Sequence, residues 1–105
     1  MFGNLAEMAN MLKKAKEIKG NMQAMKSEMA MTEVSGTAAG GKVIAVVSGD
    51  FTVKRITIDP SIDESNEMLA QIVTIAINDA INNTRILLQQ KMKDVTGGLD
   101  IPDIF

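Results

Sequence analysis

Apolar side chains recur at alternating spacings of three and four residues through the first third of the chain. This heptad repeat predicts one proline-free helix over about residues 4–30. Its apolar positions, called the heptad seam below, are Met8, Met11, Ala15, Ile18, Met22, Met25 and Met29. At 1.5 Å per residue the helix would be about 40 Å long, which exceeds the width of a compact domain of 105 residues. We therefore expect part of the seam to face a partner chain; a seam that only covers its own domain is the alternative.

The spacing of apolar residues becomes that of β-strands after Met31. β-Branched residues form a continuous run between Lys42 and Ser48, which predicts a buried strand. Turn sequences rich in glycine or aspartate flank this run, so that three strands are expected, at residues 32–37, 42–48 and 51–58. The sequence thus predicts a three-stranded antiparallel sheet over about residues 32–59.

A second helix is predicted over about residues 65–95. Pro60 ends the sheet, acidic residues at 63, 64 and 67 favour a helix N-terminus, and Gly97-Gly98 ends the helix. Apolar residues cover most of its surface, as expected for a helix that lies on the sheet and also touches another element. An apolar tail, residues 97–105, follows it. Residues 1–105 are therefore expected to form a single α+β domain in the order α-β-β-β-α.

The composition removes most catalytic chemistry. The chain contains no His and no Cys, and so lacks the commonest general base, the commonest zinc ligands and the thiol nucleophile. Residues 36–42 fit the Gly-x-x-x-x-Gly-Lys pattern of a phosphate-binding loop, but Val43 stands where Ser or Thr is needed and opens a strand instead of a helix. We expect no enzyme activity, no cofactor, no metal site and no small-molecule substrate.

Two further features bear on the cellular location. The longest uninterrupted apolar run is Val43–Val47, whereas a membrane span needs roughly 18 residues, so no membrane partner is expected. The absence of cysteine fits a reducing compartment. The expected location is the cytoplasm.

Positive charge is concentrated on the first predicted helix. The formal net charge of the chain is −2, yet residues 1–30 carry a net +2, and four lysines fall within seven positions: Lys13, Lys14, Lys16 and Lys19. On the register of the heptad seam, Lys13, Lys14 and Lys16 are expected to point away from the seam and Lys19 to flank it. This fits either a surface that contacts phosphates or an ordinary solvated helix face. The chain has no Tyr or Trp and its three Phe are scattered, which favours duplex DNA over stacking on single strands.

Several segments, in their order and spacing, carry a resemblance. They are Met1-Phe2-Gly3-Asn4 with the Met- and Lys-rich helix after it, Val34-Ser35-Gly36, Ile56-Thr57-Ile58-Asp59-Pro60-Ser61, Ala76-Ile77-Asn78-Asp79-Ala80, and Lys91-Met92 leading into Val95-Thr96-Gly97-Gly98-Leu99. With them the chain resembles, over essentially its whole length, the YbaB/EbfC family of bacterial nucleoid-associated proteins. The resemblance implies a tweezers-like homodimer that joins through its sheet region and binds double-stranded DNA with projecting helices. The DNA-binding residues that it implies here are Lys13, Lys14, Lys16, Lys19, Arg85, Lys91 and Lys93.

The sequence therefore leads to one main hypothesis and one alternative. The main hypothesis is a homodimeric protein of the cytoplasm and nucleoid that contacts DNA phosphates through lysines of its first helix, in nucleoid organisation and gene regulation. The alternative is a protein–protein adaptor that captures another chain with the heptad seam and the apolar tail.

Overall fold

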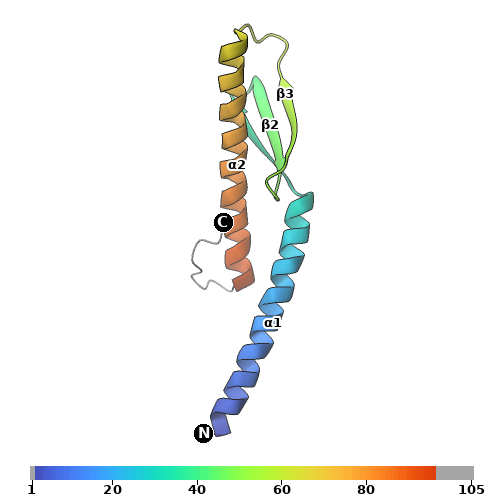
Figure 1. Ribbon diagram of the computed structural model, residues 1–105, viewed down its shortest axis with the longest axis vertical. Coiled ribbons are helices and arrows are strands. Elements are labelled where there is room, and N and C mark those ends of the chain that lie inside the picture. Colours follow the sequence, from blue (N-terminus) through green and yellow to red (C-terminus); the bar gives the residue numbers. More distant parts are fainter. Residues whose placement is uncertain (1, 97–105) are drawn as a thin grey trace.

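A long helix, three strands and a second long helix follow one another in the computed structural model, which describes residues 2–96 (Figure 1). The elements are α1 (Phe2–Met31), β1 (Glu33–Ala38), β2 (Val43–Ser48), β3 (Val53–Ile58) and α2 (Asn66–Thr96). The predicted α+β class and element order are confirmed. The apolar tail expected at residues 97–105 lies outside the described residues.

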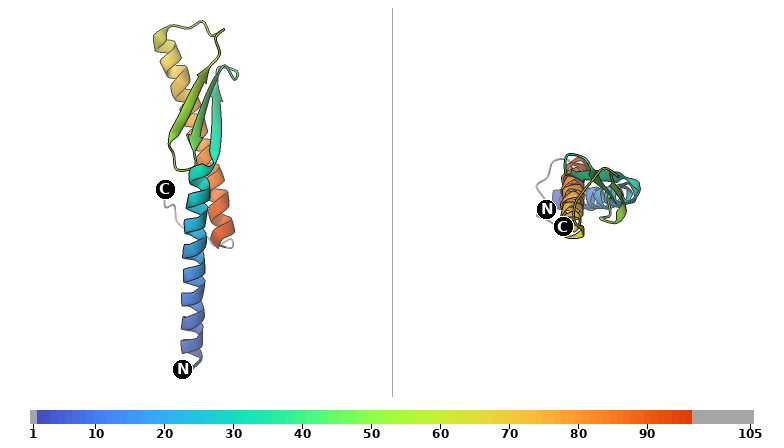
Figure 2. Two further views of the ribbon diagram at one scale, coloured as in Figure 1. Left: turned by 90° about the vertical axis from the view of Figure 1, so that its right-hand side faces the viewer. Right: turned by 90° about the horizontal axis from the view of Figure 1, so that it is seen from above.

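The three strands form one antiparallel sheet in the order β1-β2-β3. Every second residue of β2 faces α2, so that Val43, Ala45 and Val47 are fully buried. They pack against Ala76 and Ala80 of α2 in the main hydrophobic core. The sheet and α2 make two layers, with the sheet lying against one side of the helix (Figure 2).

The turn between β2 and β3 is longer than the sequence predicted. Phe51, expected in the third strand, lies in the turn with a φ of 65°, and β3 begins at Val53. The amide of Phe51 donates to the Ser48 carbonyl (2.9 Å) and the amide of Ser48 donates to the Thr52 carbonyl (2.8 Å), which closes the turn. The extra residue is absorbed by a register shift at Val46/Val47.

This turn also docks on the C-terminal end of α1. The amide of Gly49 donates to the carbonyls of Met29 and Thr32, both at 2.9 Å, and so satisfies orphan carbonyls at the helix end. A Cβ added to Gly49 would lie 2.3 Å from the Met29 oxygen, so only glycine permits this approach. The contact fixes where α1 leaves the sheet.

A second hydrophobic cluster joins the two helices. It consists of Met25 and Met29 of α1 with Leu88 and Met92 of α2, all buried. The helices run in opposite directions at this contact (Figure 1). The C-terminal part of the heptad seam is therefore covered within the protomer.

Candidate nucleic-acid interface

The first half of α1 projects beyond the rest of the protein. Every residue from 4 to 17 is exposed, and α1 continues well past the end of α2 (Figure 1). The chain extends 73 × 21 × 17 Å with a radius of gyration of 19.9 Å, against about 13 Å for a compact chain of this length. The projection expected from the helix length is present.

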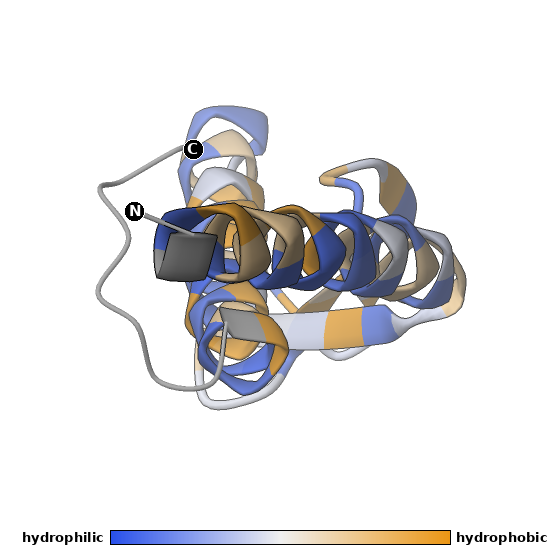
Figure 3. Ribbon diagram, turned by 90° about the horizontal axis from the view of Figure 1, so that it is seen from below, coloured by the Kyte–Doolittle hydropathy of each residue, from blue (hydrophilic) through white to orange (hydrophobic). Residues whose placement is uncertain are grey.

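The four clustered lysines lie on or beside this projecting half. Lys13, Lys14, Lys16 and Lys19 are all exposed. By the 3.6-residue turn, Lys13 and Lys16 lie about 150° from the direction in which Met25 and Met29 are buried. Lys14, expected to point away from the seam, instead flanks it on one side, because it directly precedes the seam residue Ala15; Lys19 flanks the seam on the other side. Figure 3 looks from the end at which α1 begins and shows hydrophilic and hydrophobic positions mixed around this helix.

The cluster is suited in size and charge to a polyanion. Its ends, Lys13 and Lys19, are six residues apart, which is about 9 Å along the helix and comparable to a few phosphate steps of DNA. The acidic residues Glu7 and Glu17 lie on the same half of α1, which leaves it with a net +2 over residues 4–21. The arrangement offers ammonium groups to phosphates but no aromatic surface for stacking.

The basic residues of α2 have different surroundings. The ammonium of Lys91 pairs with the Glu28 carboxylate at 3.2 Å, and Glu28 lies nine residues, about 14 Å, along α1 from Lys19. Lys91, Glu28 and Asp94 line an open hollow of about 330 Å³ between the helices. Arg85 and Lys93 are exposed. The structure therefore does not bring Lys91 into the lysine cluster of α1, and it places two carboxylates beside it.

The heptad seam is divided at its middle. Met25 and Met29 are buried against α2, Ile18 and Met22 are half-buried, and Met8, Met11 and Ala15 are exposed. Two further large apolar side chains of this half, Leu5 and Leu12, are also exposed. The seam thus has one part that builds the protomer and one part that nothing in the described chain covers.

Sequence reasoning missed a pair of residues on α2 that seals one edge of the sheet. The Asp79 carboxylate accepts the amide of Thr37 (2.9 Å), and the Asn83 side-chain amide donates to the Ser35 carbonyl (3.1 Å). Both bonds satisfy outward-facing backbone groups of the edge strand β1. The sequence contains one indication of this contact. Asp79 follows the core-packed Ile72 by two helical turns and therefore lies on the side of α2 that faces the sheet.

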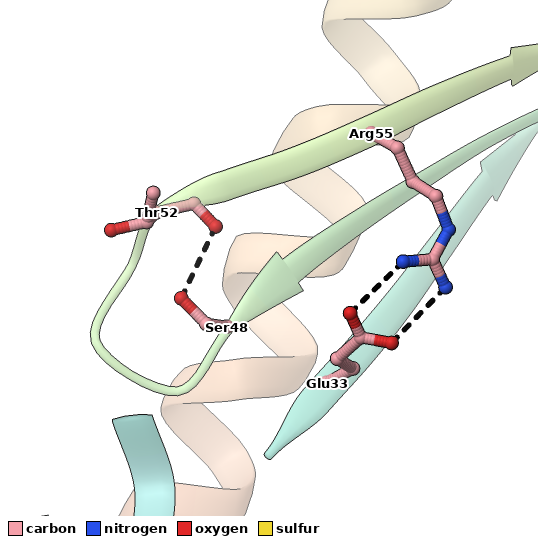
Figure 4. Close-up of polar contacts among 4 residues, drawn as sticks. All are labelled: Glu33, Ser48, Thr52 and Arg55. Carbon is pink, nitrogen blue, oxygen red and sulfur yellow. Dashed lines mark hydrogen bonds and ion pairs between the residues drawn. The ribbon is translucent and has the colours of Figure 1, made fainter. Parts of the chain in front are cut away.

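An ion pair crosses the face of the sheet that α2 leaves open (Figure 4). Arg55 of β3 reaches over β2 to Glu33 of β1 and donates two hydrogen bonds, at 2.9 and 3.1 Å. These bonds from the guanidinium lower the pKa of Glu33 from its usual range. The Arg55 guanidinium is therefore engaged within the protomer. At the end of β2, the Ser48 hydroxyl lies within 3.4 Å of the Thr52 carbonyl and also donates to the Asp50 carboxylate, which lowers the pKa of Asp50.

Within residues 2–96 no helix combines the length and apolarity that crossing a bilayer requires. The same part of the chain contains no group of three or more acidic side chains placed to hold a metal ion.

Comparison with known proteins decides the family. The model of the YbaB/EbfC DNA-binding family matches residues 3–99. The chain belongs to this family. The resemblance noted in the sequence is thereby confirmed, and the chain is placed among nucleoid-associated DNA-binding proteins instead of a family of enzymes.

One solved structure shows the same fold. The crystal structure of the uncharacterised protein HP0035 from Helicobacter pylori matches with a TM-score of 0.66 and 18% sequence identity. The match covers 92% of this chain and 98% of that one. The likeness of fold therefore extends over most of both chains.

Proposed function

We propose that this protein is a homodimer that binds double-stranded DNA without a cofactor and acts in nucleoid organisation and gene regulation. Phosphates are contacted by Lys13, Lys14, Lys16 and Lys19 of each protomer, with Arg85, Lys91 and Lys93 as secondary contacts. Membership of a DNA-binding family supports the partner. The lysines of α1 are proposed as the main contacts because all four gather where α1 projects, away from the acidic remainder of the protein.

The chemistry of these lysines predicts affinity with little sequence selectivity. An ammonium group on a flexible stem binds phosphate as a point charge and reads no base pattern. The protomer carries a net charge of −2, so attraction to DNA depends on the local field of the projecting helix instead of on the whole molecule. A dimer doubles the cluster, and the two clusters bind one duplex more tightly than either alone.

The sheet region supplies the dimer interface in this proposal. Its two edges differ, since β1 is sealed by Asp79 and Asn83 while β3 is exposed along most of its length. Val53 and Ile58 of β3 are exposed apolar residues beside that edge. An open edge with apolar side chains is a surface on which a second chain adds contacts at little cost.

A gel-shift titration against salt tests the proposal. If about four to eight phosphates are neutralised per dimer, the logarithm of affinity falls against the logarithm of salt concentration with a slope of about −4 to −7. Duplexes of unrelated sequence are expected to give similar slopes. Absence of duplex binding even at low salt contradicts the proposal, and a slope near zero removes the lysines as the source of affinity.

A further inference from the structure

The uncovered half of the heptad seam continues a surface that already binds a helix. Met29 is 2% exposed where α2 lies on the seam, whereas Met8 and Met11, on the same line of α1, are 58% and 70% exposed. Leu5 and Leu12, which flank Met8 and Met11, are similarly exposed. Isolated apolar residues on a surface are ordinary, but a row at heptad spacing that extends an existing helix contact fits a further helix.

The flanking positions of this half-seam select the direction of a second helix. With Met8 and Ala15 at the a positions and Met11 at d, the g positions hold Glu7 and Lys14, and the e positions hold Leu5, Leu12 and Lys19. In a parallel pair of two such helices, g of one contacts the following e of the other. Lys14 of each copy would then lie against Lys19 of the other, twice per pair, which is repulsive.

The antiparallel arrangement turns the same charges into attraction. If Met8 of one copy packs on Met11 of the second copy, Ala15 packs on Asn4, and the g positions bring Glu7 of one copy to Lys14 of the other. The e positions bring Leu12 of one copy to Leu5 of the other. Each contact occurs twice by the two-fold symmetry, so two ion pairs and two leucine pairs flank the methionine layers.

We propose that the projecting half of α1 pairs antiparallel with the same half of α1 in a second copy of this chain, over about residues 4–15. In this register the beginning of α1 of the second copy lies opposite Ile18 of the first copy. From Met22 onward the seam is covered by α2 of the same protomer. The two helices thus cover the seam end to end without competing for it. The α1 helix of the second copy would thus run antiparallel to α1 of the first, in the same direction as α2 of the first protomer (Figure 1).

This contact is distinct from the sheet-region dimer and does not depend on DNA binding. Lys13 and Lys16 lie about 150° from the seam and stay in solvent when two arms pair. Where both contacts form, arm pairing joins one sheet-region dimer to another and sets lysines of different dimers side by side. The protein would then hold two DNA-contacting units together.

Cysteine cross-linking tests the direction, because the chain has no native cysteine. A mixture of the Asn4→Cys and Ala15→Cys proteins is expected to form a disulfide-linked heterodimer on mild oxidation. Either protein alone is expected to form at least about ten-fold less, since its two cysteines would be about 16 Å apart along the pair and a disulfide spans at most about 7 Å between Cα atoms. Efficient linkage of Ala15→Cys alone indicates parallel helices and overturns the proposal. Absence of linkage in the mixture also overturns the proposal, and is the result expected if residues 97–105 or another protein cover the seam instead.

Charge reversal tests the residues that give the direction. Glu7→Lys is expected to weaken self-association about ten-fold in sedimentation equilibrium at low salt, and Glu7→Lys with Lys14→Glu to restore it to within about three-fold. Glu17→Lys is the matched control, with the same charge change at an outer position of the helix, and is expected to change little. Equal effects of Glu7→Lys and Glu17→Lys overturn the proposal. Neither experiment uses DNA, so its outcome is separate from that of the salt titration.

Discussion

Gly36 of β1 lies directly against the backbone of Ala80 in α2. A Cβ added to Gly36 would lie 2.1 Å from the Ala80 nitrogen and 2.6 Å from the Ala76 oxygen. The facing groups are backbone atoms of a helix, which cannot turn aside as a side chain does. This close approach brings Asp79 and Asn83 within hydrogen-bonding distance of β1, so one glycine sets the spacing between the two layers.

Gly36→Ala is expected to destabilise the protein by about 1–3 kcal/mol, because α2 must move away from β1. Urea denaturation measures the free energy of unfolding. Gly20→Ala is the control, since no atom lies within 4 Å of a Cβ at this position, and it is expected to stabilise α1 by about 0.5–1 kcal/mol. Equal stability of the Gly36→Ala protein and the wild type would show that the layers are not held this closely.

Met29→Ala is expected to lower the free energy of unfolding by about 2–5 kcal/mol, because it leaves a cavity between α1 and α2. Met11→Ala removes the same atoms from the exposed part of the seam and is expected to change protomer stability by less than about 0.5 kcal/mol. Thermal and urea unfolding at low protein concentration measure the stability of the two variants and so distinguish the two effects. A large loss in Met11→Ala under these conditions would mean that α1 is covered along its whole length.

Asp79→Ala is expected to expose the amide of Thr37 on the edge of the sheet. Loss of this bond, at a cost of about 1–1.5 kcal/mol, raises the hydrogen-exchange rate of the Thr37 amide roughly ten-fold. Exchange measured by NMR at single residues reads this directly. Asp63→Ala, at an exposed acidic residue outside the sheet, serves as the control. An unchanged rate at Thr37 would show that the carboxylate does not protect the edge.

The Glu33–Arg55 pair is expected to stabilise the fold only above the acid range. Because Arg55 lowers the pKa of Glu33 in the folded state, the folded protein binds this proton less readily than the unfolded chain. The contribution is complete above the ordinary glutamate pKa of about 4.3 and is lost as the pH falls through the lowered folded-state pKa. The stability difference between wild type and Arg55→Met should therefore shrink from pH 6 towards pH 2. A difference independent of pH contradicts this account.

Replacing Lys13, Lys14 and Lys16 by Gln is expected to weaken binding to all duplex sequences alike and to make the salt dependence shallower by about 0.9 per lost phosphate contact. The triple variant at Lys26, Lys42 and Lys54 removes the same charge from exposed positions outside the cluster. Gel shifts of the two variants side by side separate a local effect from one of net charge. Equal losses in both would assign the affinity to net charge instead of to the projecting helix.

Much of the secondary structure follows from local patterns. The three-and-four spacing of methionines is sufficient to predict α1, and the β-branched run at residues 43–47 is sufficient to predict β2. Both predictions depend only on which neighbouring positions are apolar. Phe51 lies outside the strand that its apolar character and alternation predict. Closure of the turn by Ser48 and Thr52 outweighs that preference. Local propensity does not include hydrogen bonds that form only when two strands meet.

Only part of the candidate site could be predicted from the sequence, because local patterns do not contain contacts between distant segments. The lysine cluster can be read from the sequence, since residues 13–19 share one helix and their mutual positions follow from its geometry. The pairing of Lys91 with Glu28 cannot, because 63 residues separate them along the chain. The capping of β1 by Asp79 and Asn83 is likewise a contact between distant segments, which no periodicity contains.

The sequence by itself determined the helices, the strands, their order and the concentration of lysine on the first helix, all of which depend on residues close together in the chain. Only the tertiary structure decided how the heptad seam is divided. The docking of the β2–β3 turn on the end of α1, through Gly49, fixes where α2 meets the seam. Met25 and Met29 are buried where they pack against Leu88 and Met92 of α2, whereas Met8 and Met11 lie on the part of α1 that continues beyond α2 and are exposed.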